Sequence, residues 1–97
     1  MDQSVTHIKL SQMPAFKRAY KKLTPTEKEK VDEAIHVLIK DPSIGEEKKG
    51  DLAGVFVYQF KSHHQLMLLA YEWNVHERLL LMLGVHENFY RDLKNKR

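Results

Sequence analysis

The sequence predicts an α+β fold, in which an N-terminal αα-hairpin packs on a twisted antiparallel sheet and a short helix follows the last strand. Two observations favour this fold. Apolar residues recur at helical spacing as far as Lys40, and from Val55 onward β-branched and aromatic runs alternate with short polar turns. The chain has 97 residues, of which 42% are hydrophobic, so we expect one core and a single domain over residues 1–97.

The first helix is expected over Ser11–Leu23. Pro14 is tolerated only in a first helical turn and therefore marks its beginning. One apolar face follows from spacings of three, four and seven residues: Phe16, Ala19, Tyr20 and Leu23. Before this helix, Val5–Leu10 could add a short N-terminal strand, although its alternation is weak.

The second helix is expected over Pro25–Lys40. Thr24 can cap it, Pro25 suits the first helical position, and Glu27 completes a capping box. Asp41-Pro42 ends it, because a residue before proline is pushed out of the helical region. The very short connection predicts that the two helices form an antiparallel hairpin.

Three strands should follow the Pro42–Gly54 loop, at Val55–Phe60, Leu66–Trp73 and Arg78–Val85. Their short turns predict a three-stranded antiparallel meander, and Glu87–Lys94 can form the terminal helix. In the first strand, valines should lie on one face and aromatic residues on the other. The sheet face away from the hairpin, if left open, would be concave and basic.

The composition excludes several classes of protein. The chain has no cysteine, so it contains neither disulfides nor thiolate metal sites. It has no HExxH, GxGxxG, P-loop or Gly-x-Ser-x-Gly motif, and we expect no metal ion and no cofactor. A formal charge of +3 permits an acidic or nucleic-acid partner. No export signal or membrane span is visible, which predicts a cytoplasmic protein without a membrane partner.

The strongest chemical candidate is His86, which comes directly after the last predicted strand. A histidine there can act as general acid or base near neutral pH, or simply be a surface or capping residue. Glu87 could cap the terminal helix, and it could pair with Arg91 one turn later. Arg91 could equally bind a phosphate, and Tyr90 could supply a hydroxyl, a stacking ring or only packing.

Cations cluster around the first strand. Lys48 and Lys49 precede it, and Lys61 lies with His63 and His64 in the turn after it. These residues could hold a polyanion, although lysines beside strands often serve solubility and edge protection. The sheet aromatics could stack on bases, but strand alternation places most of them in the core.

The order of these elements, with residues 48–74 (KKGDLAGVFVYQFKSHHQLMLLAYEWN) and 79–94 (LLLMLGVHENFYRDLK), resembles the RelE/ParE superfamily of toxins from type II toxin–antitoxin systems, especially its ParE-like branch. The resemblance covers nearly the whole chain, and HENFYRDLK is its most specific part. It implies an antitoxin partner.

The resemblance to RelE-type members implies ribosome-dependent cleavage of mRNA, in which the 2′-OH attacks the adjacent phosphate and leaves a 2′,3′-cyclic phosphate. His86 matches a catalytic position after the last strand, as general acid or base. Lys48 or Lys49 matches the basic loop, either to bind phosphate or, with a lowered pKa, to transfer a proton. Tyr90 and Arg91 match positions for stacking and charge stabilisation.

The chain departs from the RelE pattern at Gln65, where RelE-type enzymes usually carry an arginine at the start of the second meander strand. His63 and His64 could substitute for it, with Lys61, in binding RNA. ParE-type relatives share the fold, lack the nuclease residues and inhibit DNA gyrase, so gyrase is the alternative target. A domain that only binds RNA or an antitoxin is a third possibility.

Overall fold

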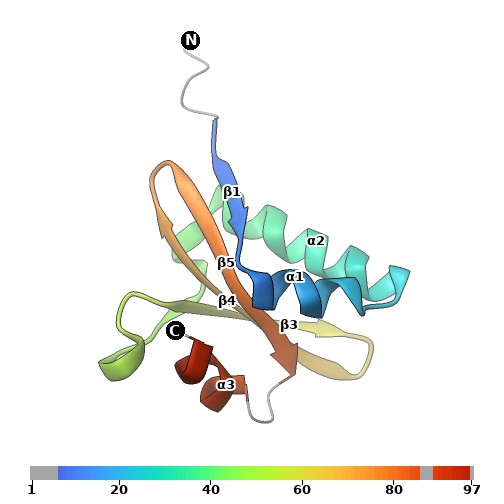
Figure 1. Ribbon diagram of the computed structural model, residues 1–97. Helices are drawn as coiled ribbons and strands as arrows, with labels where there is room; N and C mark the ends of the chain where they lie inside the picture. The colour runs from blue at the N-terminus through green and yellow to red at the C-terminus, as the bar shows by residue number, and fades with distance from the viewer. Residues whose placement is uncertain (1–6, 86–88, 97) are drawn as a thin grey trace.

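The computed structural model describes residues 7–85 and 89–96, which form a five-stranded sheet with helices on both faces (Figure 1). The elements in chain order are β1 (Lys9–Gln12), α1 (Pro14–Lys21), α2 (Pro25–Lys40), the 3-10 turn η2 (Pro42–Ile44), β2 (Glu46–Glu47), the 3-10 turn η3 (Gly50–Leu52), β3 (Phe56–Ser62), β4 (Gln65–Asn74), β5 (Glu77–Val85) and α3 (Phe89–Lys96). None of the described helices is both long and apolar enough to cross a membrane.

The sheet is mixed, with strand order β1-β5-β4-β3-β2, so the prediction of a purely antiparallel sheet is wrong. The antiparallel meander β3-β4-β5 is confirmed at its centre. β1 adds in parallel beside β5, and the two-residue strand β2 pairs with the start of β3. β2 could not be predicted, because two consecutive glutamates show no strand periodicity.

The leading strand runs over Lys9–Gln12, later than the predicted Val5–Leu10, whose first two residues lie outside the described part of the chain. Ser11, assigned in the prediction to the first helix, belongs to this strand instead. Its hydroxyl donates to Glu77 of β5 at 2.8 Å. The polar residues of β1 misled the prediction because an edge strand need not alternate with apolar residues.

The helical hairpin is confirmed, with a shorter first helix that begins at Pro14. The capping box of α2 forms as predicted: Glu27 N donates to Thr24 Oγ1 at 3.2 Å, and Thr24 N donates to Glu27 Oε1 at 2.9 Å. Pro25 has no N–H, so the capping box satisfies two of the three backbone N–H groups that lack a partner at the start of α2, and this start is locally encoded.

The first core lies between the hairpin and one face of the sheet. Its buried members come from both helices and from β4 and β5: Phe16, Val31, Ala34, Leu38, Met67, Leu69, Tyr71, Leu80 and Leu83. Four sheet aromatics pack against it, namely Phe56, Tyr58, Phe60 and Trp73. The prediction that most of these rings belong to a core is therefore confirmed.

Two buried polar side chains join the sheet to the end of α2. Arg78 donates from Nε to Leu38 O and from Nη2 to Ile39 O, both at 2.9 Å, and from Nη1 to Asn74 O at 2.7 Å. A cation at this end suits the helix dipole. Tyr71 Oη donates to Pro42 O at 2.6 Å and accepts from Gly45 N at 3.0 Å.

The second core covers the opposite face of the sheet, so this face is not left open and the condition for a concave basic surface is not met. α3 and η3 pack there over the valines of the first meander strand (Figure 1). The buried members are Leu52, Val55, Val57, Leu68, Ala70, Phe89 and Leu93. Gly84 allows Phe89 to approach, since a Cβ at Gly84 would lie only 3.3 Å from the ring.

Candidate functional site

The loop around Lys48 meets helix α3 at Tyr90. The backbone of Lys48 is held against the sheet, because its N–H donates to Val55 O at 2.8 Å. Its ammonium lies 4.8 Å from the centre of the Tyr90 ring, and the ring of Phe89 packs edge-on against Tyr90 at 5.4 Å. The structure thus brings together two of the predicted site residues, from segments far apart in the chain.

Glu46 is the third member of this group, since Lys48 Nζ donates to Glu46 Oε1 at 3.0 Å. Only 21% of the Lys48 side chain is exposed, against 70% of Glu46. Burial alone would lower the pKa of Lys48, but its bonds to Glu46 and Tyr90 outweigh this and raise the pKa above its ordinary value. Lys48 is therefore held as a cation, which does not suit proton abstraction, and an anion that binds it has to compete with the Glu46 carboxylate.

A second charged contact joins the same loop to α3. Lys94 Nζ lies 3.7 Å from Asp51 Oδ2, and both side chains are largely exposed. Such a pair contributes little to stability. The buried side chains Phe89 and Leu93, and not this pair, hold α3 against the sheet.

Lys49 and Arg91 flank this junction in sequence but face solvent. Lys49 precedes η3 and is exposed. The Arg91 side chain is 69% exposed, and its Nε lies 3.8 Å from Asp92 Oδ1. Both cations are thus accessible to a polyanion, although Arg91 has a neighbouring carboxylate to compete for it.

The residues Lys61, His63 and His64 form a separate exposed group at the β3–β4 turn. Lys61 and Lys48 lie at opposite ends of β3, about 20 Å apart along the strand. His63 has a φ of 60°, in the left-handed region that side chains other than glycine rarely adopt. The turn lies at the end of the sheet where Met67 pairs with Val85, the last residue of β5.

His86 and Glu87 lie outside the described residues. The predicted acid/base role of His86, the predicted cap by Glu87 and its predicted ion pair with Arg91 remain predictions.

Sequence reasoning missed Glu46 and Asp51 as partners of the site cations. Residues two apart on a strand share a face, but Pro42–Gly54 was expected to be a loop, so the pair of Glu46 with Lys48 had no signal in the sequence. Asp51 contacts Lys94 because α3 packs beside the loop, and the local sequence around Asp51 does not predict this contact. Among residues 7–85 and 89–96, no three His, Asp or Glu side chains are grouped to hold a metal ion.

The fold matches solved toxin structures at low sequence identity. A mutant of E. coli toxin RelE in the free state has a TM-score of 0.71 and 13% identity, with 93% of each chain covered. The E. coli RelBE toxin–antitoxin complex matches with a TM-score of 0.68 and 16% identity, over 82% of this chain and 98% of that chain. The YoeB/ParE toxin from Agrobacterium tumefaciens matches with a TM-score of 0.66 and 18% identity, over 81% of this chain and 99% of that chain.

No curated protein matches the sequence significantly. A family model does match, over residues 10–94, and its description is a ParE-like toxin of a type II bacterial toxin–antitoxin system. The matched range includes α1, α2, most of α3 and all of the sheet except Lys9, and it agrees with the resemblance drawn from the order of elements. The chain therefore belongs to the ParE-like toxin family of type II bacterial toxin–antitoxin systems.

Proposed function

We propose that the protein arrests growth as a ribosome-dependent mRNA endonuclease in the cytoplasm and that a cognate antitoxin neutralises it. The observation that carries this proposal is the Lys48–Tyr90 pair, in which a partly buried lysine is held charged beside an aromatic ring. The RelE fold likeness supports the same activity by analogy.

The proposed reaction needs three kinds of group. One base takes the proton from the ribose 2′-OH, which attacks the adjacent phosphorus, and one acid protonates the departing 5′-oxygen. The extra negative charge on the phosphate needs a fixed cation. His86 is proposed as the general acid or base. Lys48 is proposed as a cation that holds the RNA away from the reacting phosphate, because it lies at the other end of β3 from the point where β5 ends.

The remaining candidates would hold the substrate. Tyr90 would stack on a base or donate its hydroxyl, while Lys49 and Arg91 would contact phosphates from the solvent side. Lys61, His63 and His64 would bind the RNA backbone further along, since about 20 Å of strand separates them from Lys48.

Inhibition of DNA gyrase is the second candidate function, and a specific observation favours it. Gln65, at the start of β4, is exposed and stands where RelE-type enzymes usually carry an arginine. Arg78 cannot replace that arginine, because its guanidinium is buried and donates to backbone carbonyls.

The purified protein in a coupled translation reaction and in a gyrase supercoiling reaction would separate the two functions. We expect ribosome-dependent cuts in mRNA and no loss of supercoiling. Loss of supercoiling without cuts would replace the nuclease by the gyrase inhibitor.

Lys48→Met tests the site itself and should lower the cleavage rate about 10²-fold, because the RNA loses a fixed cation that positions it. Lys28→Met is the matched control, since Lys28 Nζ lies 5.5 Å from the Tyr20 ring on the hairpin. Equal cleavage by wild type and Lys48→Met would exclude Lys48 from the reaction.

His86→Ala should relieve growth arrest, because the reaction loses its proposed general acid or base, and should leave antitoxin binding intact. Unchanged toxicity of this variant would exclude His86 as the catalytic group.

A further inference from the structure

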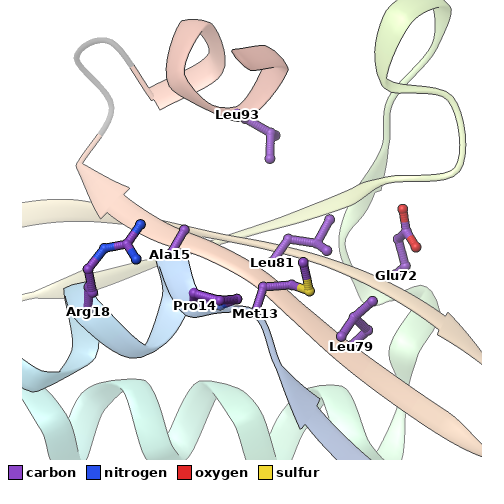
Figure 2. Close-up of a pocket in the computed structure, with 8 residues that line it drawn as sticks. All are labelled: Met13, Pro14, Ala15, Arg18, Glu72, Leu79, Leu81 and Leu93. Carbon is purple, nitrogen blue, oxygen red and sulfur yellow. The ribbon is translucent and has the colours of Figure 1, made fainter. Parts of the chain in front are cut away.

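Strand β1 is bordered by two grooves, one on each face of the sheet. The groove on the α3 face opens between Met13 and Leu93 and has a volume of about 390 Å³ (Figure 2). Its charged lining residues, Arg18 and Glu72, have opposite signs, so it favours neither an acidic nor a basic occupant. The groove on the hairpin face has a volume of about 350 Å³ and lies between β1, α1 and α2. Because β1 is an outermost strand of the sheet, this second groove lies where a further strand would add.

The outer edge of β1 carries backbone groups that no strand of the described sheet pairs. The N–H groups of Lys9 and Met13 both donate at 2.9 Å to carbonyls in β5 or just before it. Successive residues of a strand direct their backbone groups to opposite sides, so Ile8, Leu10 and Gln12 direct theirs outward. Leu10, at the centre of this edge, is also 40% exposed. Such an edge is a template for pairing with another strand.

The edge is complementary to itself in one antiparallel register, in which Leu10 faces Leu10 of a second copy. In this register Ile8 faces Gln12, and each facing pair exchanges both of its N–H···O bonds. Facing residues share a face of the sheet, so Ile8 stands at the hairpin-face groove that Gln12 lines in the other copy. A register centred on Lys9 would place two lysines opposite each other, and one centred a residue after Leu10 would place Ile8 opposite Pro14, which has no N–H.

Charges on the α3 face of β1 fit the same register. Ser11 Oγ donates to Glu77 Oε2 at 2.8 Å, so the Glu77 carboxylate lies beside Ser11. Ser11 faces Lys9 of the second copy when the two Leu10 residues face each other. The Lys9 ammonium of each copy therefore meets the Glu77 carboxylate of the other, once on each side of the two-fold axis. This charge complementarity favours a second copy of the chain as the occupant of the edge.

We propose that two copies of the chain associate through antiparallel pairing of their β1 strands, with Ile8 of each copy in the hairpin-face groove of the other and Lys9 against Glu77. The loop around Lys48 lies at the opposite edge of the sheet, beside β2, so this dimer leaves the Lys48–Tyr90 pair of each copy uncovered. The paired strand is short and a formal charge of +3 opposes self-association, so we expect a weak dimer with a Kd of about 10–100 µM.

Charge reversal tests the proposal through the Kd of the dimer, measured by sedimentation equilibrium of the purified chain alone. Lys9→Glu and Glu77→Lys should each weaken the dimer about tenfold or more, since like charges then face each other across the axis. An equal mixture of the two variants should associate within about threefold of the wild type, because the mixed dimer has both pairs with their signs exchanged. A wild-type chain that stays monomeric at about 1 mM, or a mixture as weak as either variant, overturns the proposal.

Disulfide trapping gives an independent measurement, because the chain has no cysteine. Leu10→Cys places two thiols across the axis, with Cα atoms about 5.5 Å apart, so mild oxidation should rapidly link two copies. Met13→Cys is the matched control, since Met13 is 42% exposed and Leu10 40%, but the two copies of Met13 lie about 20 Å apart in this register. Equal rates of linkage for the two variants overturn the pairing of β1. Neither experiment contains RNA or antitoxin, so its outcome is independent of the proposed RNA cleavage.

Discussion

The two faces of the sheet are covered in different ways. On the hairpin face, buried hydrogen bonds reinforce the apolar core: Arg78 holds the last carbonyls of α2, and Tyr71 holds the loop after it. On the α3 face, the polar contacts with the loop around Lys48 are mostly exposed, and the apolar surface beyond Leu93 continues into an open groove.

This difference assigns stability mainly to the hairpin face and the proposed functional contacts to the α3 face. Buried polar groups that are fully paired cost much to disrupt, whereas exposed ion pairs contribute little. The hairpin face therefore serves as the rigid scaffold. The α3 face carries exposed charged residues above its own apolar core, so changes to the proposed RNA contacts at its surface should disturb the fold little.

The largest effect on stability is expected for Arg78→Met. Loss of the guanidinium leaves the carbonyls of Leu38, Ile39 and Asn74 without their donor, at a cost of about 3 kcal/mol in the free energy of unfolding. Chemical denaturation measures it, with Arg18→Met as the exposed control. A loss no larger than that of the control would show that the hairpin face does not depend on this buried cation.

Tyr71→Phe should come next, at about 2 kcal/mol, because Gly45 N and Pro42 O lose their buried partner. Tyr20→Phe is the matched control, since its hydroxyl donates to Asp32 at 2.9 Å on an exposed surface. Equal losses of unfolding free energy in the two variants would show that burial of the Tyr71 hydroxyl does not strengthen its hydrogen bonds.

Tyr71→Phe should also change how the free energy of unfolding depends on pH. Burial raises the pKa of Tyr71 above its ordinary value of 10.0, so the folded state keeps the phenolic proton to higher pH than the unfolded state. This stabilisation is complete at pH values below the pKa of Tyr71 in the unfolded state. It is lost as pH rises through the pKa of Tyr71 in the folded state. Tyr71→Phe should therefore make the alkaline fall in stability shallower, as followed by denaturation at increasing pH.

The smallest effect is expected on the α3 face. Lys94→Gln removes an exposed pair and should change the free energy of unfolding by less than about 0.5 kcal/mol, and less still at high salt. Lys30→Gln is matched to it, because Lys30 pairs with Glu33 at 3.9 Å on the exposed surface of α2. A loss from Lys94→Gln far above that of Lys30→Gln would mean that charge, and not Phe89 and Leu93, holds α3 in place.

The sequence by itself determined the local structure: the capping box of α2, the helical hairpin, the three meander strands and the alternation that divides valines from aromatic residues. These features depend on residues within a few positions of one another, so their signals lie in single segments. The cations around β3 and α3 were also named from sequence, although their roles in RNA cleavage remain predictions.

The tertiary structure alone decided which of these residues meet. The parallel pairing of β1, the cover of the second face by α3, the contact of Lys48 with Tyr90 and the groove beside Met13 all join distant segments. Such contacts depend on how whole helices and strands pack together, and the periodicity within one segment cannot predict that packing. Glu46 shows the same limit, since its spacing to Lys48 is visible in the sequence but its effect on the pKa of Lys48 depends on the burial and on Tyr90.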